Sequence, residues 1–288
     1  MCRASACHAE LFWTNCCIDA GWRATRFSDA SYREYTAMMG LPVPLLLVVM
    51  IGLKLANIMV DSLHAMELGW AAHIIGNIMW ETITNHSWGR PNQDENTKAL
   101  EVDMIKWYKA EKVTSRVQGT LNKERIRADG EYPKLRAKAA AIRHLAPYAL
   151  ILCIRFNSGS LHDQRKLGVA QLLVRYYEIL KMPTMFLPSA VAAELAQLVR
   201  DMGVLYHALY HEAHVANLRL WKMTPKIHLC IHLGEEQAGS FGNPSYFWCY
   251  ADEDLIGLMT ETAESLHVRT LAPVLMVKWL VIAFDAED

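Results

Sequence analysis

Two acidic side chains, Asp61 and Glu253, stand at positions where a carboxylate can bind a metal ion. Asp61 follows an apolar run (residues 51–60) and precedes His64, and Glu253 follows an aromatic run (residues 246–250). An acid at the end of a buried strand is held by rigid backbone and still reaches the surface, as a metal-binding carboxylate must. The two acids are far apart in the sequence, so only tertiary folding can bring them together, and we expect that it does.

Histidines accompany both acidic elements. His64 lies three positions after Asp61, and His228 and His232 are four positions apart, so either a helix or a strand places them on one face. Near an acidic metal site these three histidines would support the chemistry by positioning water or phosphate. Hydrogen-bonded core histidines are the alternative.

A basic stretch between residues 106 and 143 forms a second candidate site. Eleven Lys or Arg residues face four acids there, a local net charge of +7, and Trp107 and Tyr108 stand near its start. Basic side chains beside aromatic ones suit a phosphate backbone and unpaired bases, whereas a solvated helical face is the alternative. The predicted nucleic-acid contacts are Lys106, Lys109, Lys112, Arg116, Lys123, Arg125 and Arg127.

The elements that position these residues are expected to be mostly helical. Apolar side chains recur at steps of three and four residues, which is typical of amphipathic helices. The patterns predict helices over residues 62–83, 134–156, 161–180 and 190–221, the last with Ser189 as its N-cap. The run 45–50 suits a buried strand or a helix.

Composition limits the function classes. The 288 residues are 52% apolar and 20% charged, which is enough for a large core. The net charge of −1 creates no global field that would select nucleic acid or membrane. The apolar segments 41–60 and 271–284 each contain a lysine, so we expect core elements and no membrane partner.

The cysteines favour a reducing compartment. There are seven of them, an odd number with irregular spacing. The early group has no C-x-x-C pair, so we expect free thiols there and not a zinc site; it consists of Cys2, Cys7, His8, Cys16 and Cys17.

Two motifs resemble a known family. The pattern Pro225-Lys226-x-His228-x-x-x-His232, a glycine-containing turn and the run Phe247-Trp248-Cys249-Tyr250 before Glu253 resemble the C-terminal segment of DDE-type DNA transposases. They are most similar to CACTA-like and related transposable elements. Upstream, Asp61-Ser62-Leu63-His64 before Leu68-Gly69 resembles the segment around the second catalytic aspartate of that family.

The resemblance implies an α+β fold that is predominantly helical, with a remnant of an RNase H-like mixed sheet and a large helical insertion. It implies that Asp61 and Glu253 are catalytic and that Asp61, Glu253 and Asp252 bind metal, with Asp254 as a register alternative. The implied domains are an irregular N-terminal segment (1–40), an RNase H-like catalytic portion (41–85 and 223–288) and a helical insertion (86–222).

The implied activity is metal-dependent cleavage and transfer of DNA strands. Three carboxylates would hold two Mg²⁺ or Mn²⁺ ions, one activating water or a 3′-hydroxyl and the other stabilising the leaving oxygen. We expect DNA (transposon ends) as the partner, a homo-oligomer as an option, and a nuclear or intracellular location.

The first catalytic aspartate of the family has no clear counterpart. Asp19 and Asp29 are candidates, but neither follows a convincing strand. Two alternatives therefore stay open. The chain is a transposase, or it is truncated at its N-terminus and inactive, acting as a non-catalytic helical module that binds DNA or protein.

Overall fold

The protein is described here by a computed structural model, which places residues 14–16, 19–25, 27–43, 50 and 52–285. In these ranges all regular structure is helical and no strand occurs. The predicted α+β class with an RNase H-like sheet remnant is therefore wrong. The chain divides into two compact units, Met1–Phe247 and Trp248–Asp288. The predicted division into three sequence domains stays a prediction.

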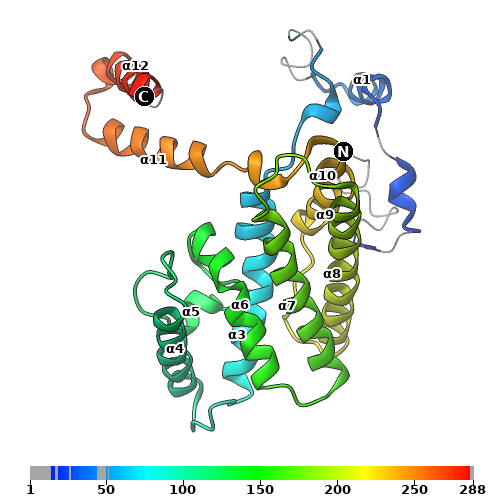
Figure 1. Ribbon diagram of the computed structural model, residues 1–288, viewed down its shortest axis with the longest axis vertical. Coiled ribbons are helices and arrows are strands. Elements are labelled where there is room, and N and C mark those ends of the chain that lie inside the picture. The colour runs from blue at the N-terminus through cyan, green and yellow to red at the C-terminus, as the bar shows by residue number, and fades with distance from the viewer. Residues whose placement is uncertain (1–13, 17–18, 26, 44–49, 51, 286–288) are drawn as a thin grey trace. The chain divides into compact units, whose positions relative to one another are not determined.

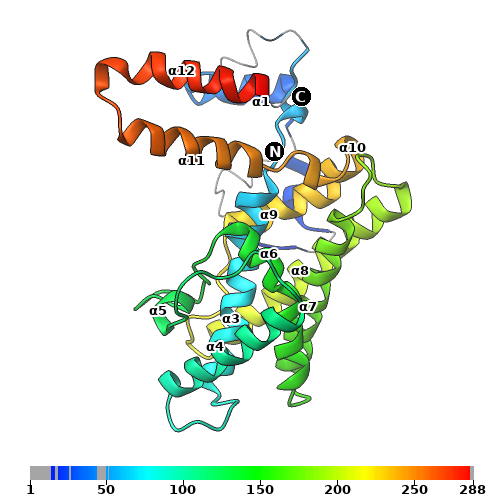
Figure 2. The same cartoon turned by 60° about the vertical axis from the view of Figure 1, so that its left-hand side comes forward.

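The first unit is a bundle in which α3, α6, α7 and α8 pack side by side (Figures 1 and 2). Its elements are η3 (Gly21–Thr25), α1 (Asp29–Met38), η4 (Leu55–Asn57), η5 (Leu63–Ala71), α3 (Ala72–Thr84), α4 (Gln93–Ala110), α5 (Lys123–Ile126), α6 (Ala139–Arg155), α7 (Leu161–Leu180), α8 (Ser189–Val215), α9 (Pro225–His232), η6 (Leu233–Gln237), α10 (Ala238–Phe241) and η7 (Pro244–Tyr246). Of these, η3, η4 and η7 are 3-10 helices, and η5 and η6 are π-helical.

The centre of this bundle is the continuous helix formed by η5 and α3. Nearly all of its side chains are buried, and Trp70, Ile74 and Ile78 are at most 1% exposed. A helix that is apolar on every side has to be surrounded by other elements. Here η5 packs against α6 and α9, and α3 packs against α4, α5, α6 and α7.

The apolar segment before Asp61 is not a strand. Residues 55–57 form η4, and the next three residues are fixed by a glutamine side chain. The Gln237 Nε2 donates to the Ile58 carbonyl at 2.9 Å, and its Oε1 accepts from the Val60 N–H at 2.8 Å. The side-chain amide of Gln237 thus makes the backbone hydrogen bonds that a neighbouring strand would make in a sheet. Residues 45–49 of the predicted strand or helix at 45–50 lie outside the described residues.

The aromatic run before Glu253 is not a strand either. The Asn243 side chain accepts from the Ser245 N–H at 3.0 Å, and Pro244 opens η7. Asn followed by Pro is a turn signal, and a proline cannot donate to a sheet. The chain then enters the next helix directly, so neither acidic element is mounted on a strand.

The second unit is a pair of helices, α11 (Tyr250–Glu264) and α12 (Val268–Asp285). The Lys278 Nζ donates to the Thr262 Oγ1 at 2.5 Å and links them. No described side chain of this unit is buried.

Among the described residues, no helix is both long and apolar enough to cross a bilayer. In the early cysteine group, Cys16 is buried, and Cys2, Cys7, His8 and Cys17 lie outside the described residues.

Candidate functional site

Asp61 begins the central helix. Its carboxylate oxygens accept from the N–H groups of Leu63 (3.0 Å) and His64 (3.1 Å), which would otherwise lack partners at the helix start. The ring Nδ1 of His64 lies 2.5 Å from the same carboxylate. Asp61 and His64 therefore lie together, as expected. Asp61 caps the helix N-terminus, where a negative charge is favourable, and pairs with His64.

The nearest acid in the same helix is Glu67, and it is a poor metal ligand. Burial raises the pKa of Glu67 to about 8, so the side chain is mainly protonated at neutral pH. The Ser62 hydroxyl donates to its Oε2 at 3.4 Å and also hydrogen-bonds the Tyr176 hydroxyl at 3.0 Å. Because Mg²⁺ and Mn²⁺ prefer ionised carboxylates, a protonated Glu67 does not complete a site for either ion beside Asp61.

Glu253, Asp252 and Asp254 are exposed residues at the N-terminal end of α11 in the second unit. Acids in a first turn are favourable there whether or not they bind a metal. The meeting of Asp61 with Glu253 would join two units and stays a prediction. Within the part of the chain that the structure describes, no three His, Cys, Asp or Glu side chains are grouped as a metal site requires.

Of the two candidates for the first aspartate, Asp19 is exposed. The carboxylate of Asp29 accepts from the Leu55 N–H at 2.7 Å and so ties α1 to η4. Neither forms part of a group with Asp61 that could hold a metal.

The two histidines of α9 are core residues. The Nε2 atoms of His228 and His232 are 3.1 Å apart, and both rings meet Trp22 edge to face. The other ring nitrogen of His232, Nδ1, lies 2.6 Å from Glu236 Oε1. The structure thus brings these histidines together but buries them, with 2–3% exposure, away from solvent.

The predicted nucleic-acid contacts divide into two groups. Lys106, Lys109 and Lys112 are exposed at the C-terminal end of α4. The others include residues whose side chains already contact other parts of the protein. Lys123 pairs with Asp94 at 3.0 Å, and the guanidinium groups of Arg116 and Arg125 donate to nearby backbone carbonyls.

The loop between α5 and α6 carries Lys134 and Arg136 over the face of α3. The Leu135 N–H donates to the Ala72 carbonyl at 2.9 Å. A Cβ at Gly76 would lie 2.7 Å from the Leu135 nitrogen, so only glycine allows this close approach of loop backbone to helix. The central helix therefore fixes the position of two exposed cations.

A second basic segment, residues 219–226, lies against this loop. The Arg219 guanidinium donates to the Gly130 carbonyl at 2.5 Å, and the Lys222 Nζ lies 5.5 Å from the centre of the Tyr132 ring. Lys226 packs over η5, where a Cβ at Gly69 would lie 2.7 Å from its Cδ. Folding thus gathers cations from two distant parts of the sequence. We call the following six side chains the basic cluster: Arg127, Lys134, Arg136, Arg219, Lys222 and Lys226.

The cations of the basic cluster repel one another. Burial, followed by the charges of Lys226, Arg136 and Lys222, lowers the pKa of Lys134. Burial and the charge of Arg219 lower the pKa of Arg127, against a smaller opposite effect of a nearby aspartate. In the described part of the chain no ion pair joins a member of the cluster to a carboxylate. Positive charge that no ion pair neutralises favours an anionic ligand.

Three cations of the basic cluster also affect the pKa of the buried residue His73. Its Nδ1 lies 2.9 Å from the Pro133 carbonyl. Burial lowers the pKa of His73 to about 4, the Pro133 hydrogen bond opposes this, and Lys134, Lys222 and Lys226 add to the lowering. The imidazole is therefore neutral at physiological pH and adds no charge.

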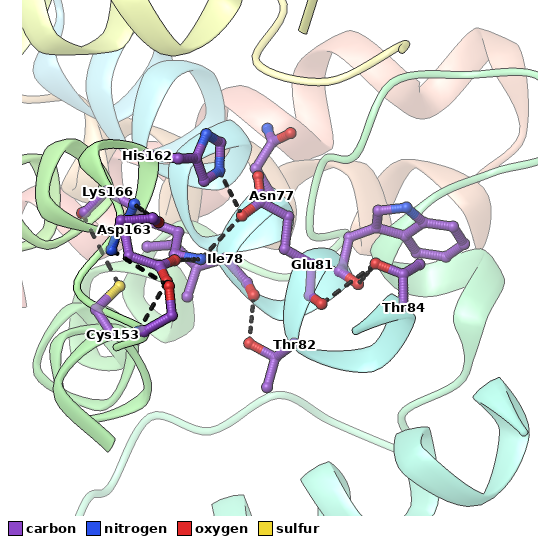
Figure 3. A network of polar contacts seen from close by, with 12 residues as sticks. Asn77, Ile78, Glu81, Thr82, Thr84, Cys153, His162, Asp163 and Lys166 are labelled. Atoms are coloured by element: carbon purple, nitrogen blue, oxygen red, sulfur yellow. Dashed lines mark hydrogen bonds and ion pairs between the residues drawn. The ribbon is translucent and has the colours of Figure 1, made fainter. Parts of the chain in front are cut away.

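A buried polar network holds the 219–226 segment in place. Trp221 donates its backbone N–H to Asn77 Oδ1 at 2.8 Å and its indole N–H to Glu81 Oε1 at 2.7 Å. Glu81 also accepts from the Lys166 Nζ at 2.9 Å and lies 3.0 Å from the His162 Nε2 (Figure 3). Burial alone would raise the pKa of Glu81, but the hydrogen bond from His162 and the charge of Lys166 lower it overall. The carboxylate is thus ionised and anchors the basic segment to α3.

Sequence reasoning found Arg127 but missed the contribution of residues 219–226. A signal was present, because this segment contains three basic residues and no acid. The motif beginning at Pro225 was instead interpreted through the spacing of its two histidines and through the family resemblance.

Comparison of the chain with protein-family models, with curated proteins and with solved structures finds no match.

Proposed function

We propose that the first unit is a non-catalytic helical module that binds nucleic acid, with the basic cluster contacting backbone phosphates. The observation that carries this proposal is the convergence of six cations, from residues 127–136 and 219–226, with no carboxylate paired to any of them in the described chain. Phosphate binding relieves such repulsion and releases counterions.

The resemblance to transposable-element proteins supports DNA as the nucleic acid. The proposal keeps the relation to transposable-element proteins that the resemblance implies. It leaves out strand cleavage, because the described residues contain no group of three acids, histidines or cysteines that could hold a metal ion. The exposed lysines of α4 (Lys106, Lys109 and Lys112) would extend the phosphate contacts beyond the basic cluster.

A salt titration of duplex binding tests the proposal. The double variant Lys134→Ala with Lys222→Ala removes two exposed members of the cluster, and fluorescence anisotropy with a short labelled duplex gives the affinity. The slope of log K against log salt is expected to fall in magnitude by about 1.8, since each phosphate contact contributes about 0.9.

The matched control removes two cations that already have carboxylate partners. Arg155 pairs with Asp103 at 2.7 Å, and Arg175 pairs with Glu194 at 2.7 Å. The double variant Arg155→Ala with Arg175→Ala has the same net charge as the test variant and is expected to keep the wild-type slope. Equal losses in both variants, or no duplex binding by the wild type, would overturn the proposal.

A further inference from the structure

A cavity of about 590 Å³ lies between the end of α4 and the helices α6 and α7. Aliphatic side chains form much of its lining, among them Leu150, Ile151 and Val174. Its volume lies in the range of small-molecule sites, and the function proposed above does not use it.

One part of the lining is aromatic. Trp107 lines the cavity and is half-buried, and its ring centre lies 5.2 Å from that of Tyr148 at an interplanar angle of 36°. Tyr148 is fully buried and holds Asp103 with its hydroxyl at 2.8 Å, so Trp107 rests on a rigid support. A supported indole ring beside an open cavity offers a stacking surface.

His144 also lines the cavity. Its Nδ1 is buried and has no hydrogen-bond partner. Burial, then the charge of Arg143, lowers the pKa of His144, which leaves a neutral ring. A neutral ring adds no charge to the lining, and its Nδ1 is covered by protein atoms, so it is not a contact for a ligand in the cavity.

The remaining lining is charged and mixed in sign. Lys112, Arg143 and Lys181 are its cations, and Glu111 and Glu178 are its acids. Lys112 and Lys181 are exposed, so they can meet an anion without being desolvated. A ligand that matches the Trp107 ring and the exposed lysines is flat and aromatic and has an attached negative charge.

We propose that this cavity binds an unpaired nucleobase of a single-stranded nucleic acid. The base stacks on Trp107, and the flanking phosphates lie near Lys112 and Lys181. The inference rests on the proposed function, because it names the form of nucleic acid that the first unit prefers. It differs in predicting that single strands gain a contact which base-paired duplexes cannot make.

The test compares a single strand with a duplex of the same sequence, using the full chain and anisotropy for both. The strand contains 2-aminopurine, whose fluorescence falls when it stacks on an aromatic ring. Trp107→Ala removes the stacking surface, and Ile154→Trp narrows the cavity at a residue that lines it and is 59% exposed. Ile105→Trp is the matched control, because Ile105 is 42% exposed on α4 and does not line the cavity.

Trp107→Ala and Ile154→Trp are each expected to weaken single-strand binding roughly tenfold, since one stacked base is worth about that much, and to leave duplex binding within about twofold. Both should abolish the quenching of 2-aminopurine, and Ile105→Trp should change neither measurement. Equal weakening of single strand and duplex, or unchanged single-strand binding, would overturn the nucleobase site.

The two proposals fail in different ways. If the wild type binds duplex through the basic cluster but the cavity variants have no selective effect, only the nucleobase site is lost. If the wild type binds neither form, the nucleic-acid function is lost. The cavity is then tested alone with 2-aminopurine riboside monophosphate. The wild type should quench its fluorescence and Trp107→Ala should not. If the wild type does not quench it, or if both quench it equally, the nucleobase site is lost as well.

Discussion

Glu67 is the most unusual single residue of the central helix. It is fully buried, its Oε1 has no hydrogen-bond partner, and burial raises its pKa to about 8. A buried acid in such surroundings keeps its proton because ionisation would place a charge in an apolar interior. Asp61 lies six residues earlier, and its carboxylate caps the start of the same helix. The two acids therefore have opposite environments.

The folded state therefore binds the proton of Glu67 more tightly than the unfolded state does. Its contribution to stability is fully present below about pH 4.5, falls as the pH rises, and is lost by about pH 8. The variant Glu67→Gln removes this titration and should be more stable than the wild type above pH 8, by on the order of a few kcal/mol. Urea unfolding at a series of pH values measures the difference.

Glu124→Gln is the control for that series, because Glu124 is an exposed acid whose loss should leave the pH profile parallel to that of the wild type. If Glu67→Gln shows the wild-type dependence on pH, then Glu67 ionises freely and does not lie in an apolar interior.

At the scale of elements, the helices were largely predictable and the two expected strands were not. The pattern over residues 161–180 matches α7, because apolar periodicity reports directly on the buried face of a helix. The sequence before Asp61 predicts a strand because it is an apolar run. Its partner is the Gln237 side chain, and a contact across so many residues leaves no local signal.

The site was predictable to the same degree. The positive charge of residues 106–143 is visible in the sequence, but its most concentrated part needs residues 219–226 to be folded against residues 127–136. That arrangement depends on Trp221 and the buried Glu81, which no spacing rule connects.

Gly76 links the central helix to the loop of the basic cluster, so its replacement tests whether the two act together. An added Cβ would meet the backbone of Lys134 and Leu135 at 2.7–2.8 Å, and backbone cannot move aside cheaply. Gly76→Ala gains about 1 kcal/mol of helix propensity. We expect overpacking to outweigh this gain, with a net loss of about 2 kcal/mol. Duplex binding should weaken with it, as anisotropy under native conditions would show.

Gly168→Ala is the matched control within a helix. Its added Cβ would meet only the end of the Leu205 side chain, at 2.8 Å, which can rotate away. We expect unchanged or increased stability and wild-type duplex binding. If Gly76→Ala behaves in the same way, the loop is not held by close contact with α3.

At the scale of the whole molecule, the overall charge hides a division between the two units. Residues 248–288 contain eight acids and two bases, a net charge of −6. The whole chain carries −1, which leaves +5 for residues 1–247. The buried side chains that the structure describes also all belong to the first unit. Both the interior and the positive charge needed to bind nucleic acid are therefore properties of Met1–Phe247.

A chain that ends at Phe247 is accordingly expected to unfold cooperatively in urea and to bind duplex. Its affinity should be roughly threefold tighter than that of the full chain at low ionic strength, because six net negative charges are gone and screening is weak there. The separate segment Trp248–Asp288 should show no cooperative transition, since none of its described side chains is buried and so short a segment seldom folds alone.

Loss of cooperative unfolding in the shortened chain would mean that the interior of the first unit depends on the second. Loss of duplex binding with folding intact would move the nucleic-acid contacts out of the basic cluster. Because Glu253 is absent from the shortened chain, retained binding also separates nucleic-acid recognition from any chemistry that this acid could perform.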